Sequence, residues 1–323
     1  MQIHHFDRDN RAGNYTFEQL FDTIRAELTK YADISVFKKP DNFGILQSIL
    51  WAKKNKGSIN HITGDVNYLA LGLPTKNTII TVHDLGHYTR SLHGWKKLIY
   101  KKLWMDLPFS NACHLTAISE FTKNQLIEFA GVPESKISVI KNPVLPFITH
   151  SPPPQNDTPV ILQIGSGTNK NLERLIHAVK GLDVKLLLIN RLENSKHVQL
   201  LNDFKIKFET RSDLDQKGLN QAYKDSDILF FASEYEGFGM PILEAQAAGR
   251  PVITGNVSAM PEASGDGALL VNPFDVEEIR DAITSIVENE KLRNELVLKG
   301  KENLKLYQVG PIAKAYLEVY ESV

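Results

Sequence analysis

The sequence predicts an α/β protein built on doubly wound parallel sheets, and three observations lead to that prediction. In the second half of the chain, short apolar segments alternate with segments of helical pattern, as they do around a parallel sheet. The first half repeats this alternation less regularly. A proline-rich segment at 150–159 separates the halves, and such a segment sustains neither a helix nor a central strand. We therefore predict one domain at 1–150 and another at 159–307.

In the first half, the apolar segments predicted as buried strands are 78–82, 115–118 and 137–140. Ser119 follows the second of these and suits the N-cap of a helix over 120–130, which Gly131 and Pro133 end. Near the end of the chain, residues 307–311 interrupt one helix before a last helix begins. Breaks of this kind let a chain change direction.

The second half shows the alternation more clearly. Its predicted strands are 160–164, 184–189, 228–232 and 251–254, and the helices between them are about 171–180, 218–224 and 241–248. Short apolar strands separated by helices indicate right-handed crossovers and a Rossmann-like domain.

Composition narrows the class of protein. The 323 residues are 42% hydrophobic and 23% charged, which is ordinary for a globular protein of two domains. A net charge of −1 gives no overall field that would attract nucleic acid. The one cysteine, Cys113, excludes an internal disulfide and fits a reducing cytoplasm. The start of the chain shows no signal pattern, and no apolar run approaches the roughly 18 residues that span a bilayer, so we expect neither secretion nor membrane insertion.

The segment 233–252 carries the clearest functional signal. Glu236 and Glu244 flank a glycine-rich turn that follows a predicted strand, at the sheet edge where open parallel sheets bind ligands. Gly237 and Gly239 allow a sharp turn, and Pro241 suits the first position of a helix, whose free N–H groups would face an anion. A diphosphate would fit there, with Glu244 accepting hydrogen bonds from paired sugar hydroxyls.

This segment resembles the Glu-x7-Glu signature of glycosyltransferase family four, a retaining family with the GT-B fold. The match includes the run from Glu236 to Pro241, the Gly-x-Pro-Val at 249–252, and Pro261-Glu262. The resemblance implies two Rossmann-like domains with a cleft between them, and a final helix, about 308–323, that packs back on the first. It also implies that Glu236 lies near the transferred sugar and Glu244 binds the ribose. The alternative is a surface helix with a capping acid.

The predicted loop at 165–171 joins a strand to a helix, so its N–H groups and Lys170 can face a phosphate. The resemblance implies that Lys170 neutralises the departing diphosphate. Many relatives carry an arginine where this chain has Ser166, and Arg191 is one candidate substitute by position. The donor-binding residues predicted in addition to Glu244 are Ser166, Gly167, Thr168, Asn169, Arg191, Gly237, Phe238, Gly239, Met240 and Pro241.

His83 follows the predicted strand at 78–82, and Asp84 comes next. By itself such a histidine is either structural or functional. The segment 81–85 is similar to the family's first-domain histidine motif, which implies that His83 contacts the donor sugar. Gly13 and Asn14 stand where relatives present glycines to the donor or the acceptor, although turn formation explains them equally well.

The segment 90–106 combines lysines and arginine with Trp95, Leu98, Ile99, Leu103 and Trp104, so it can form a basic amphipathic helix. Such a helix either lies on an anionic membrane surface or packs on the protein with a solvated lysine face. Asp225-Ser-Asp227 superficially matches a metal-binding motif of another fold, but its place predicts the end of a helix and the start of a strand.

Taken together, the residues and the resemblance predict a cytoplasmic retaining hexosyltransferase, active without an essential metal or cofactor, at or near the inner face of the cell membrane. The donor would be a nucleoside-diphosphate sugar, with UDP preferred and GDP second, and the acceptor a glycan or glycolipid of polysaccharide or lipopolysaccharide assembly. The alternatives are a sugar-nucleotide epimerase of related fold and a catalytically silent subunit that binds the nucleotide sugar.

Overall fold

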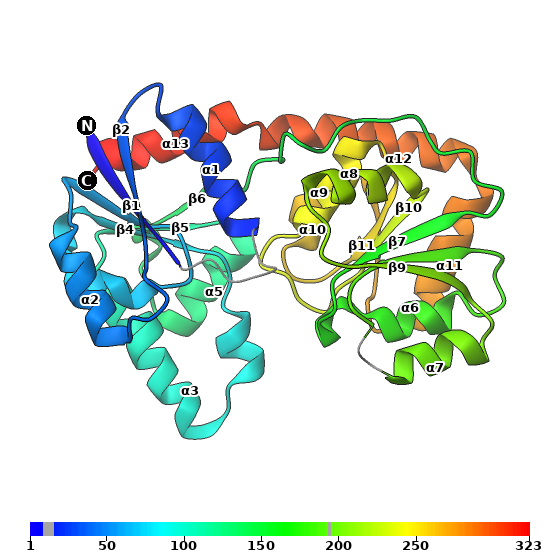
Figure 1. Cartoon of the computed structure of the whole chain (residues 1–323), viewed down its shortest axis with the longest axis horizontal. Helices are drawn as coiled ribbons and strands as arrows, with labels where there is room; N and C mark the ends of the chain where they lie inside the picture. The colour runs from blue at the N-terminus through cyan, green and yellow to red at the C-terminus, as the bar shows by residue number, and fades with distance from the viewer. Residues whose placement is uncertain (9–15, 193–194) are drawn as a thin grey trace. The chain divides into compact units, whose positions relative to one another are not determined.

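A computed structural model of the chain describes residues 1–8, 16–192 and 195–323 (Figure 1). The chain divides into two compact units, Met1–Pro143 with Tyr307–Val323, and Val144–Leu306. The division comes before the proline-rich segment at 150–159. That segment belongs to the second unit, where the buried Arg250 guanidinium donates to the carbonyl oxygens of Ser151 and Pro152 at 3.0 and 3.1 Å.

The first unit contains a parallel sheet of six strands in the order β2-β1-β3-β4-β5-β6. The strands are β1 (Gln2–Asp7), β2 (Asp33–Lys38), β3 (Ile59–Ile62), β4 (Thr78–Val82), β5 (His114–Ala117) and β6 (Ile137–Val139). The α-helices are α1 (Thr16–Leu28), α2 (Ile45–Lys54), α3 (Gly94–Tyr100), α4 (Leu107–Ser110), α5 (Glu120–Ala130) and α13 (Val309–Glu321). Shorter helical turns lie at Asn67–Gly72, Thr75–Asn77, His87–Ser91, Lys101–Asp106 and Glu134–Lys136.

Helices cover both faces of this sheet. Ile3 of β1 and Ile79 of β4 pack with apolar side chains of α1 and the chain's last helix, α13. Phe6 and Ile80 point to the other face, where α2, α4 and α5 contribute to the core. Figure 1 shows α1 and α13 on one side of the sheet and α2 and α5 on the other. The strands are thus buried on both faces, as expected for a doubly wound sheet.

The second unit contains another parallel sheet of six strands, ordered β12-β11-β10-β7-β8-β9. The strands are β7 (Val160–Ile164), β8 (Lys185–Ile189), β9 (Lys207–Arg211), β10 (Ile228–Phe231), β11 (Val252–Gly255) and β12 (Ala268–Val271). The α-helices are α6 (Leu172–Ala178), α7 (Ser195–Asp203), α8 (Gln216–Asp225), α9 (Met240–Ala248), α10 (Met260–Ser264), α11 (Val276–Glu288) and α12 (Glu290–Asn303). Short helical turns lie at Thr168–Lys170 and Leu304–Tyr307.

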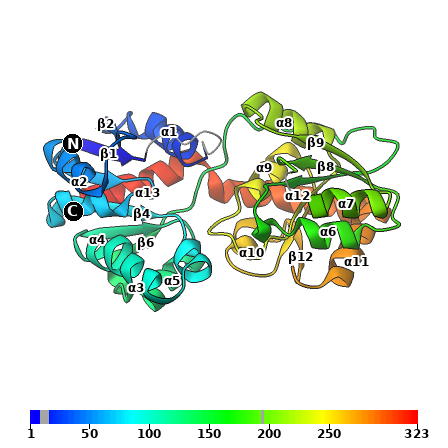
Figure 2. The same cartoon turned by 60° about the horizontal axis from the view of Figure 1, so that its bottom comes forward.

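Alternate residues of these strands pack into two separate core layers, one on each face of the sheet. Ile228 and Phe230 of β10 pack with α6, α7 and α11, whereas Leu229 and Phe231 pack with α8, α9 and α10. Figure 2 shows α6 and α7 on one side of the sheet and α8 on the other. The strand order reverses direction at β7 and β10, and ligands of open α/β sheets bind at the carboxyl ends beside such a switch point.

The elements predicted from the sequence are present. The strands at 78–82 and 160–164 and the helix at 120–130 have the predicted bounds, and Ser119 caps that helix by accepting from Thr122 N at 3.1 Å. The prediction omitted several elements, namely β1, β2, β3, α1, α2 and α4 in the first unit and α7, β9, α10 and β12 in the second.

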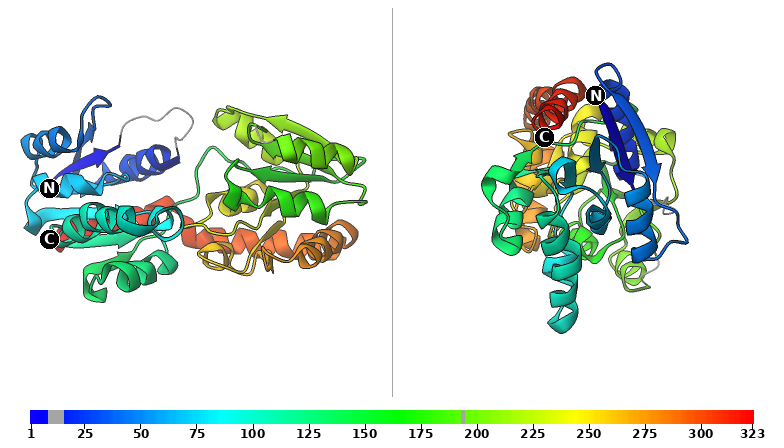
Figure 3. Two further views of the ribbon diagram at one scale, coloured as in Figure 1. Left: turned by 90° about the horizontal axis from the view of Figure 1, so that it is seen from below. Right: turned by 90° about the vertical axis from the view of Figure 1, so that its left-hand side faces the viewer.

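The basic segment is helical from α3 through Lys101–Asp106 to α4, and it projects from its unit (Figure 3). Trp104 packs against Tyr68 and lies parallel to Tyr100. Trp104 therefore packs on the protein, which is one of the two alternatives given for this segment. Trp95 and Leu98 do not pack in this way, because their exposed fractions are 67% and 70%. Within the described ranges, no helix has the length and apolar character needed to cross a membrane.

Candidate functional site

Three loops at the carboxyl ends of the second sheet are bonded to one another. After β7, the carbonyl oxygen of Asn169 accepts from Glu234 N at 2.8 Å, and the Asn169 amide donates to the carbonyl of Tyr235 at 3.2 Å. Asn171, in the left-handed region at φ 60°, donates to the carbonyls of Ala232 and Pro273 at 3.0 and 2.6 Å. These bonds fix the loop after β7 against those after β10 and β12.

Lys170 and Glu236 face each other across two of these loops. The Lys170 Nζ lies 2.6 Å from Glu236 Oε1, and both side chains are partly exposed. The ammonium also lies 4.9 Å from the centre of the Phe231 ring. Gly165, at φ 104°, makes room for the lysine, because a Cβ there would come within 2.9 Å of Lys170 Cγ. The backbone thus aims Lys170 at the carboxylate.

This ion pair leaves capacity for a ligand. An ammonium carries three N–H donors, so Lys170 can bond to Glu236 and to a phosphate oxygen at the same time. The Glu236 carboxylate in turn can accept from a sugar hydroxyl. A cation and an acceptor-only group, held side by side at a sheet edge, suit a ligand that joins a diphosphate to a sugar.

Glu244 lies one helical turn into α9 and is buried, with 5% of its surface exposed. The Tyr223 hydroxyl of α8 donates to Glu244 Oε2 at 2.7 Å. Burial raises the pKa of Glu244 to about 7, and the hydrogen bond from Tyr223 opposes that rise. The carboxylate is therefore poised between its protonated and ionised forms near neutral pH.

The start of α9 has the geometry predicted for it. Gly239, at φ 112°, precedes the helix, and Met240 and Pro241 are its first residues. A left-handed glycine followed by proline leaves the first N–H groups of the helix pointing out of its end. The loop before it is held by Ser258, whose hydroxyl accepts from Glu236 N at 3.1 Å. Sequence reasoning missed Ser258, since it lies after a different strand.

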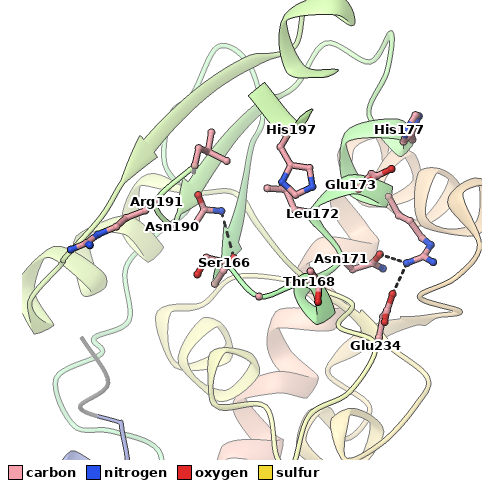
Figure 4. A pocket seen from close by; sticks show the side chains of 14 residues that line it. Ser166, Thr168, Asn171, Leu172, Glu173, His177, Asn190, Arg191, His197 and Glu234 are labelled. Atoms are coloured by element: carbon pink, nitrogen blue, oxygen red, sulfur yellow. Dashed lines mark hydrogen bonds and ion pairs between the residues drawn. The ribbon is translucent and has the colours of Figure 1, made fainter. Parts of the chain in front are cut away.

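A pocket of about 600 Å³ adjoins the loop after β7, and its lining includes Ser166, Gly167 and Thr168, three of the predicted donor-binding residues (Figure 4). Glu236 and Glu244 are not among its lining residues, so the predicted donor-binding residues are divided between this pocket and the α9 end. Arg191 lies at the rim, where it pairs with the exposed Asp213 at 2.7 Å and points away from the other lining side chains in Figure 4.

Asn190 also lines this pocket and was not predicted. Its side chain is buried, with 8% of the residue exposed, and its Nδ2 lies 3.5 Å from the Gly165 carbonyl. Its Oδ1 is buried without a hydrogen-bond partner among the described residues, so it is ready to accept from a ligand donor. The signal in the sequence was its place directly after a buried strand.

His83 belongs to the first unit, at the carboxyl end of β4. Its Nε2 donates to the carbonyl oxygen of Thr63 at 2.7 Å, which makes Nδ1 the acceptor nitrogen. Burial lowers the pKa of His83 to about 4, so the imidazole is neutral at physiological pH. Asp84 holds the following loop by accepting from Gly86 N at 2.7 Å. Gly13 and Asn14 lie outside the described residues.

Asp225 and Asp227 have the structural roles predicted for them. Asp225 is the last residue of α8, and the Asp227 carboxylate accepts from Val160 N and from the Asn156 amide, both at 2.8 Å. Within the ranges that the structure describes, no three side chains of His, Cys, Asp or Glu are grouped as metal ligands.

Comparison with protein families gives two matches. Residues 147–303 match the family described as glycosyl transferases group 1, and residues 45–145 match glycosyltransferase family 4. The chain is 30% identical over 163 residues to the MMP alpha-(1->4)-mannosyltransferase of Mycolicibacterium hassiacum, covering 47% of this chain and 40% of that protein. It is 24% identical over 256 residues to O-antigen chain mannosyltransferase B of Escherichia coli, covering 72% and 67% respectively.

Among solved structures, the chain resembles that of Anabaena HepE in complex with UDP-glucose. The TM-score is 0.81 over 100% of both chains, at 16% sequence identity. An identity this low shows the shared fold, in which two α/β units each contain a parallel sheet.

Proposed function

Because the chain belongs to the group 1 glycosyl transferases and has their two-domain GT-B fold, we propose that it moves a hexosyl group from a nucleoside-diphosphate donor to an acceptor hydroxyl, with retention of anomeric configuration. The observation that carries this proposal is the arrangement around α9, where Lys170 and Glu236 pair at 2.6 Å and Glu244 is buried in the first turns of the helix. The acceptor is a hydroxyl of a glycan or a glycolipid.

The proposed donor site gives each group one task. Lys170 and the N–H groups at the start of α9 stabilise the negative charge that develops on the diphosphate as it leaves. Glu236, together with backbone groups at Phe238 and Gly239, orients the sugar and faces the positive charge that develops at its anomeric carbon. Glu244 accepts hydrogen bonds from the ribose. Because these groups supply the stabilisation of the leaving group, the proposed reaction requires no essential metal.

UDP is the preferred nucleotide and GDP the second. The solved complex of HepE contains UDP-glucose, whereas the two curated relatives named above are mannosyltransferases, so glucosyl and mannosyl donors are the first to test. One of those relatives is named for the O-antigen chain, which supports an acceptor in surface polysaccharide or lipopolysaccharide assembly. His83 lies in the first unit, and its contact with the donor sugar stays a prediction.

The function is tested by incubating the chain with UDP-glucose, UDP-galactose, UDP-N-acetylglucosamine and GDP-mannose, with and without a lipid-linked glycan extract. Release of nucleoside diphosphate that depends on the extract, with a new α-linked sugar in NMR spectra, supports the transferase. Interconversion of the sugar without an acceptor would identify an epimerase instead. Nucleotide binding without turnover of any donor would indicate the catalytically silent subunit.

We further propose that the first unit rests on an anionic membrane surface at the inner face of the cell membrane. Trp95 and Leu98 of α3 are exposed, and Lys96, Lys97, Lys101 and Lys102 belong to the same helical segment. A second helix of this unit, α2, exposes Leu46 and Leu50 to 70% and 57% and ends in Lys53 and Lys54. Apolar side chains bordered by lysines suit the boundary between acyl chains and anionic headgroups.

Vesicle sedimentation tests this contact. The whole chain is expected to bind vesicles of phosphatidylcholine with 30% phosphatidylglycerol, and to bind phosphatidylcholine alone much less. Trp95→Ser with Leu98→Ser should abolish binding, whereas Leu298→Ser, at an equally exposed leucine of α12, should leave it unchanged. Equal binding to both kinds of vesicle, or full binding by the double variant, would contradict the proposed membrane contact.

A further inference from the structure

Both the ring and the backbone of Tyr223, on α8, are held in place by contacts with the rest of the second unit. Its ring is fully buried in the core layer formed with α9, beside Ala245. Its carbonyl oxygen accepts from Arg250 Nε and from Ser226 Oγ, both at 2.9 Å. Backbone and ring are therefore fixed, and the hydroxyl has two acceptors within reach. The nearer is Glu244 Oε2 at 2.7 Å, and the other is the carbonyl oxygen of Pro241 at 3.4 Å.

The hydroxyl in turn fixes the Glu244 carboxylate. It donates to Oε2 at 2.7 Å, and within the described part of the chain the Glu244 side chain has no other hydrogen-bond partner. The bond to the tyrosine restricts the rotation of the carboxylate and leaves Oε1 with its full capacity to accept from a ligand. Two vicinal ribose hydroxyls need acceptors at fixed positions, and a freely rotating carboxylate would lose conformational entropy on binding them.

We propose that Tyr223 is a positioning residue, which orients Glu244 so that the carboxylate accepts from the vicinal hydroxyls of the donor's ribose. This inference rests on the proposed function, because it assigns the ribose of a nucleoside diphosphate to Glu244. It adds a residue on a different helix, α8, that touches no part of the donor itself.

The electrostatics of the site make the role measurable. The elements packed against α9 are α8, α10, α12, β10 and β11, and of their titratable groups only the Tyr223 hydroxyl acts on Glu244. Burial raises the pKa of the carboxyl and the tyrosine lowers it, so loss of the hydroxyl should raise this pKa further. The tyrosine itself stays protonated, since burial raises its own pKa well above the usual value.

The test measures dissociation constants of UDP and GDP and of their 2′,3′-dideoxy analogues between pH 6 and pH 9, by calorimetry on the whole chain. The analogues carry the same phosphates, so the ratio of the two constants isolates the contribution of the diol. For the wild type, the preference for the ribose form should grow as the pH rises through about 7. Tyr223→Phe should move this midpoint upward and weaken the preference at pH 7 about tenfold.

Two further variants separate positioning from general damage. Glu244→Gln should remove the pH dependence of the ratio, and Tyr316→Phe, which loses a buried hydroxyl in the first unit, should leave the midpoint unchanged. Should Tyr223→Phe fail to fold, site-specific 3-fluorotyrosine at 223 keeps the ring and makes the hydroxyl a stronger donor, so the midpoint should move downward.

The outcomes distinguish this inference from the proposed function. If Tyr223→Phe weakens the ribose and dideoxy forms equally and leaves the midpoint in place, the tyrosine is merely structural and the positioning role is wrong, while nucleotide binding stands. If 3-fluorotyrosine at 223 leaves the midpoint of the pH dependence unchanged, the positioning role is likewise wrong. If neither UDP nor GDP binds the wild type, the proposed function fails, and the role of Tyr223 with it.

Discussion

Lys170 and Glu236 carry opposite charges at hydrogen-bond distance, in the proposed donor site. Their pairing matters because a carboxylate beside a diphosphate would otherwise repel it. With Lys170 between the two, the ammonium, 2.6 Å from the carboxylate, can attract both and so reduce their repulsion. Gly165 permits this placement, since any Cβ there would displace the lysine stem.

The first prediction separates the two partners. Lys170→Ala should weaken binding of the nucleoside diphosphate by one to two orders of magnitude, because it removes a charge-assisted hydrogen bond of roughly 1.5–3 kcal/mol. Glu236→Gln should bind the nucleotide as well as the wild type or better, and yet lose sugar transfer. Calorimetry and donor turnover measure the two effects.

Lys185→Ala is the matched control, because Lys185 pairs with Glu209 at 2.7 Å at the opposite end of the strands. Equal losses of nucleotide affinity in the Lys170 and Glu236 variants would refute this division of roles.

Burial of the ionised Glu244 carboxylate lowers the stability of the folded second unit, and the second prediction concerns this loss of stability. The unfolded chain releases this proton near pH 4.5 and the folded chain near 7, so between these values the folded state binds more protons and stability falls as the pH rises. Glu244→Gln removes the ionisation and should stabilise the second unit by roughly 2.5 kcal/mol more at pH 8 than at pH 5. Chemical denaturation at both pH values measures the difference. A gain that is independent of pH would show that burial does not raise this pKa.

At the scale of single elements, α9 is positioned by its first turn. Gly239, at φ 112°, sets the direction of the helix, and a Cβ there would lie 3.0 Å from Ile242 Cδ1. The N–H groups of the helix and Glu244 therefore depend on this one residue. Most side chains of α9 are apolar and buried, so its polar contribution to the site comes from Glu244 and from the N–H groups at its start.

The third prediction uses a pair of left-handed glycines. Gly239→Ala should destabilise the fold by about 1 kcal/mol or more and lower nucleotide affinity about tenfold, because the strained residue shifts the start of α9. Gly131→Ala places the same strain at φ 62° after α5 in the first unit, where a Cβ meets nothing within 4 Å. It should show the loss of stability without the loss of affinity. Unchanged nucleotide affinity in Gly239→Ala would exclude a role for the helix start in binding.

Strands that form continuous apolar runs were predictable, whereas strands with polar residues were not. The second group includes β3, which is buried at every residue but contains Asn60 and His61. β4 and β10 are buried at every residue and read as continuous apolar runs. β9 and β2 lie at sheet edges, have no fully buried residue, and contain charged residues such as Lys207 and Arg211, so their pattern does not differ from that of a loop. Tertiary pairing, and not local preference, makes them strands.

The same limit applies to the site. Lys170, Glu236 and Glu244 were predicted because each belongs to a local pattern at the end of a strand. Their partners Tyr223 and Ser258 were not predicted, and neither was Asn190 of the adjoining pocket. All three come from other strands and helices and meet the site only through the strand order. A single sequence gives the types of group at a sheet edge, while the distances between them depend on the packing of the sheet.

At the scale of the whole molecule, the two units should respond to pH in opposite ways. His5, His61 and His83 of the first unit are buried, and burial lowers the pKa of each, to about 3 for His61. The unfolded chain binds protons at these histidines below about pH 6.5 and the folded chain does not, so stability falls as the pH falls. Glu244 acts in the opposite sense in the second unit.

The fourth prediction follows from this contrast. Between pH 6.5 and 5.5 the first unit should lose about 3 kcal/mol, roughly 1 kcal/mol for each histidine. All three tryptophans, at 51, 95 and 104, belong to the first unit, so their fluorescence reports its unfolding alone, whereas circular dichroism reports both units. At pH 5.5 the two units should unfold in separate transitions. The unfolding transition followed by fluorescence should come first, before the remaining change in circular dichroism. Replacing the exposed His93 with glutamine should leave the order unchanged. Coincident transitions at pH 5.5 would contradict the opposite pH responses.

The proposed donor site is tested most directly by a crystal structure of the whole chain with UDP or GDP, whichever binds. We expect a diphosphate oxygen within hydrogen-bond distance of Lys170 Nζ, the phosphates at the start of α9, and the ribose hydroxyls on Glu244. A nucleotide bound elsewhere, with the Lys170–Glu236 pair and Glu244 untouched, would contradict it.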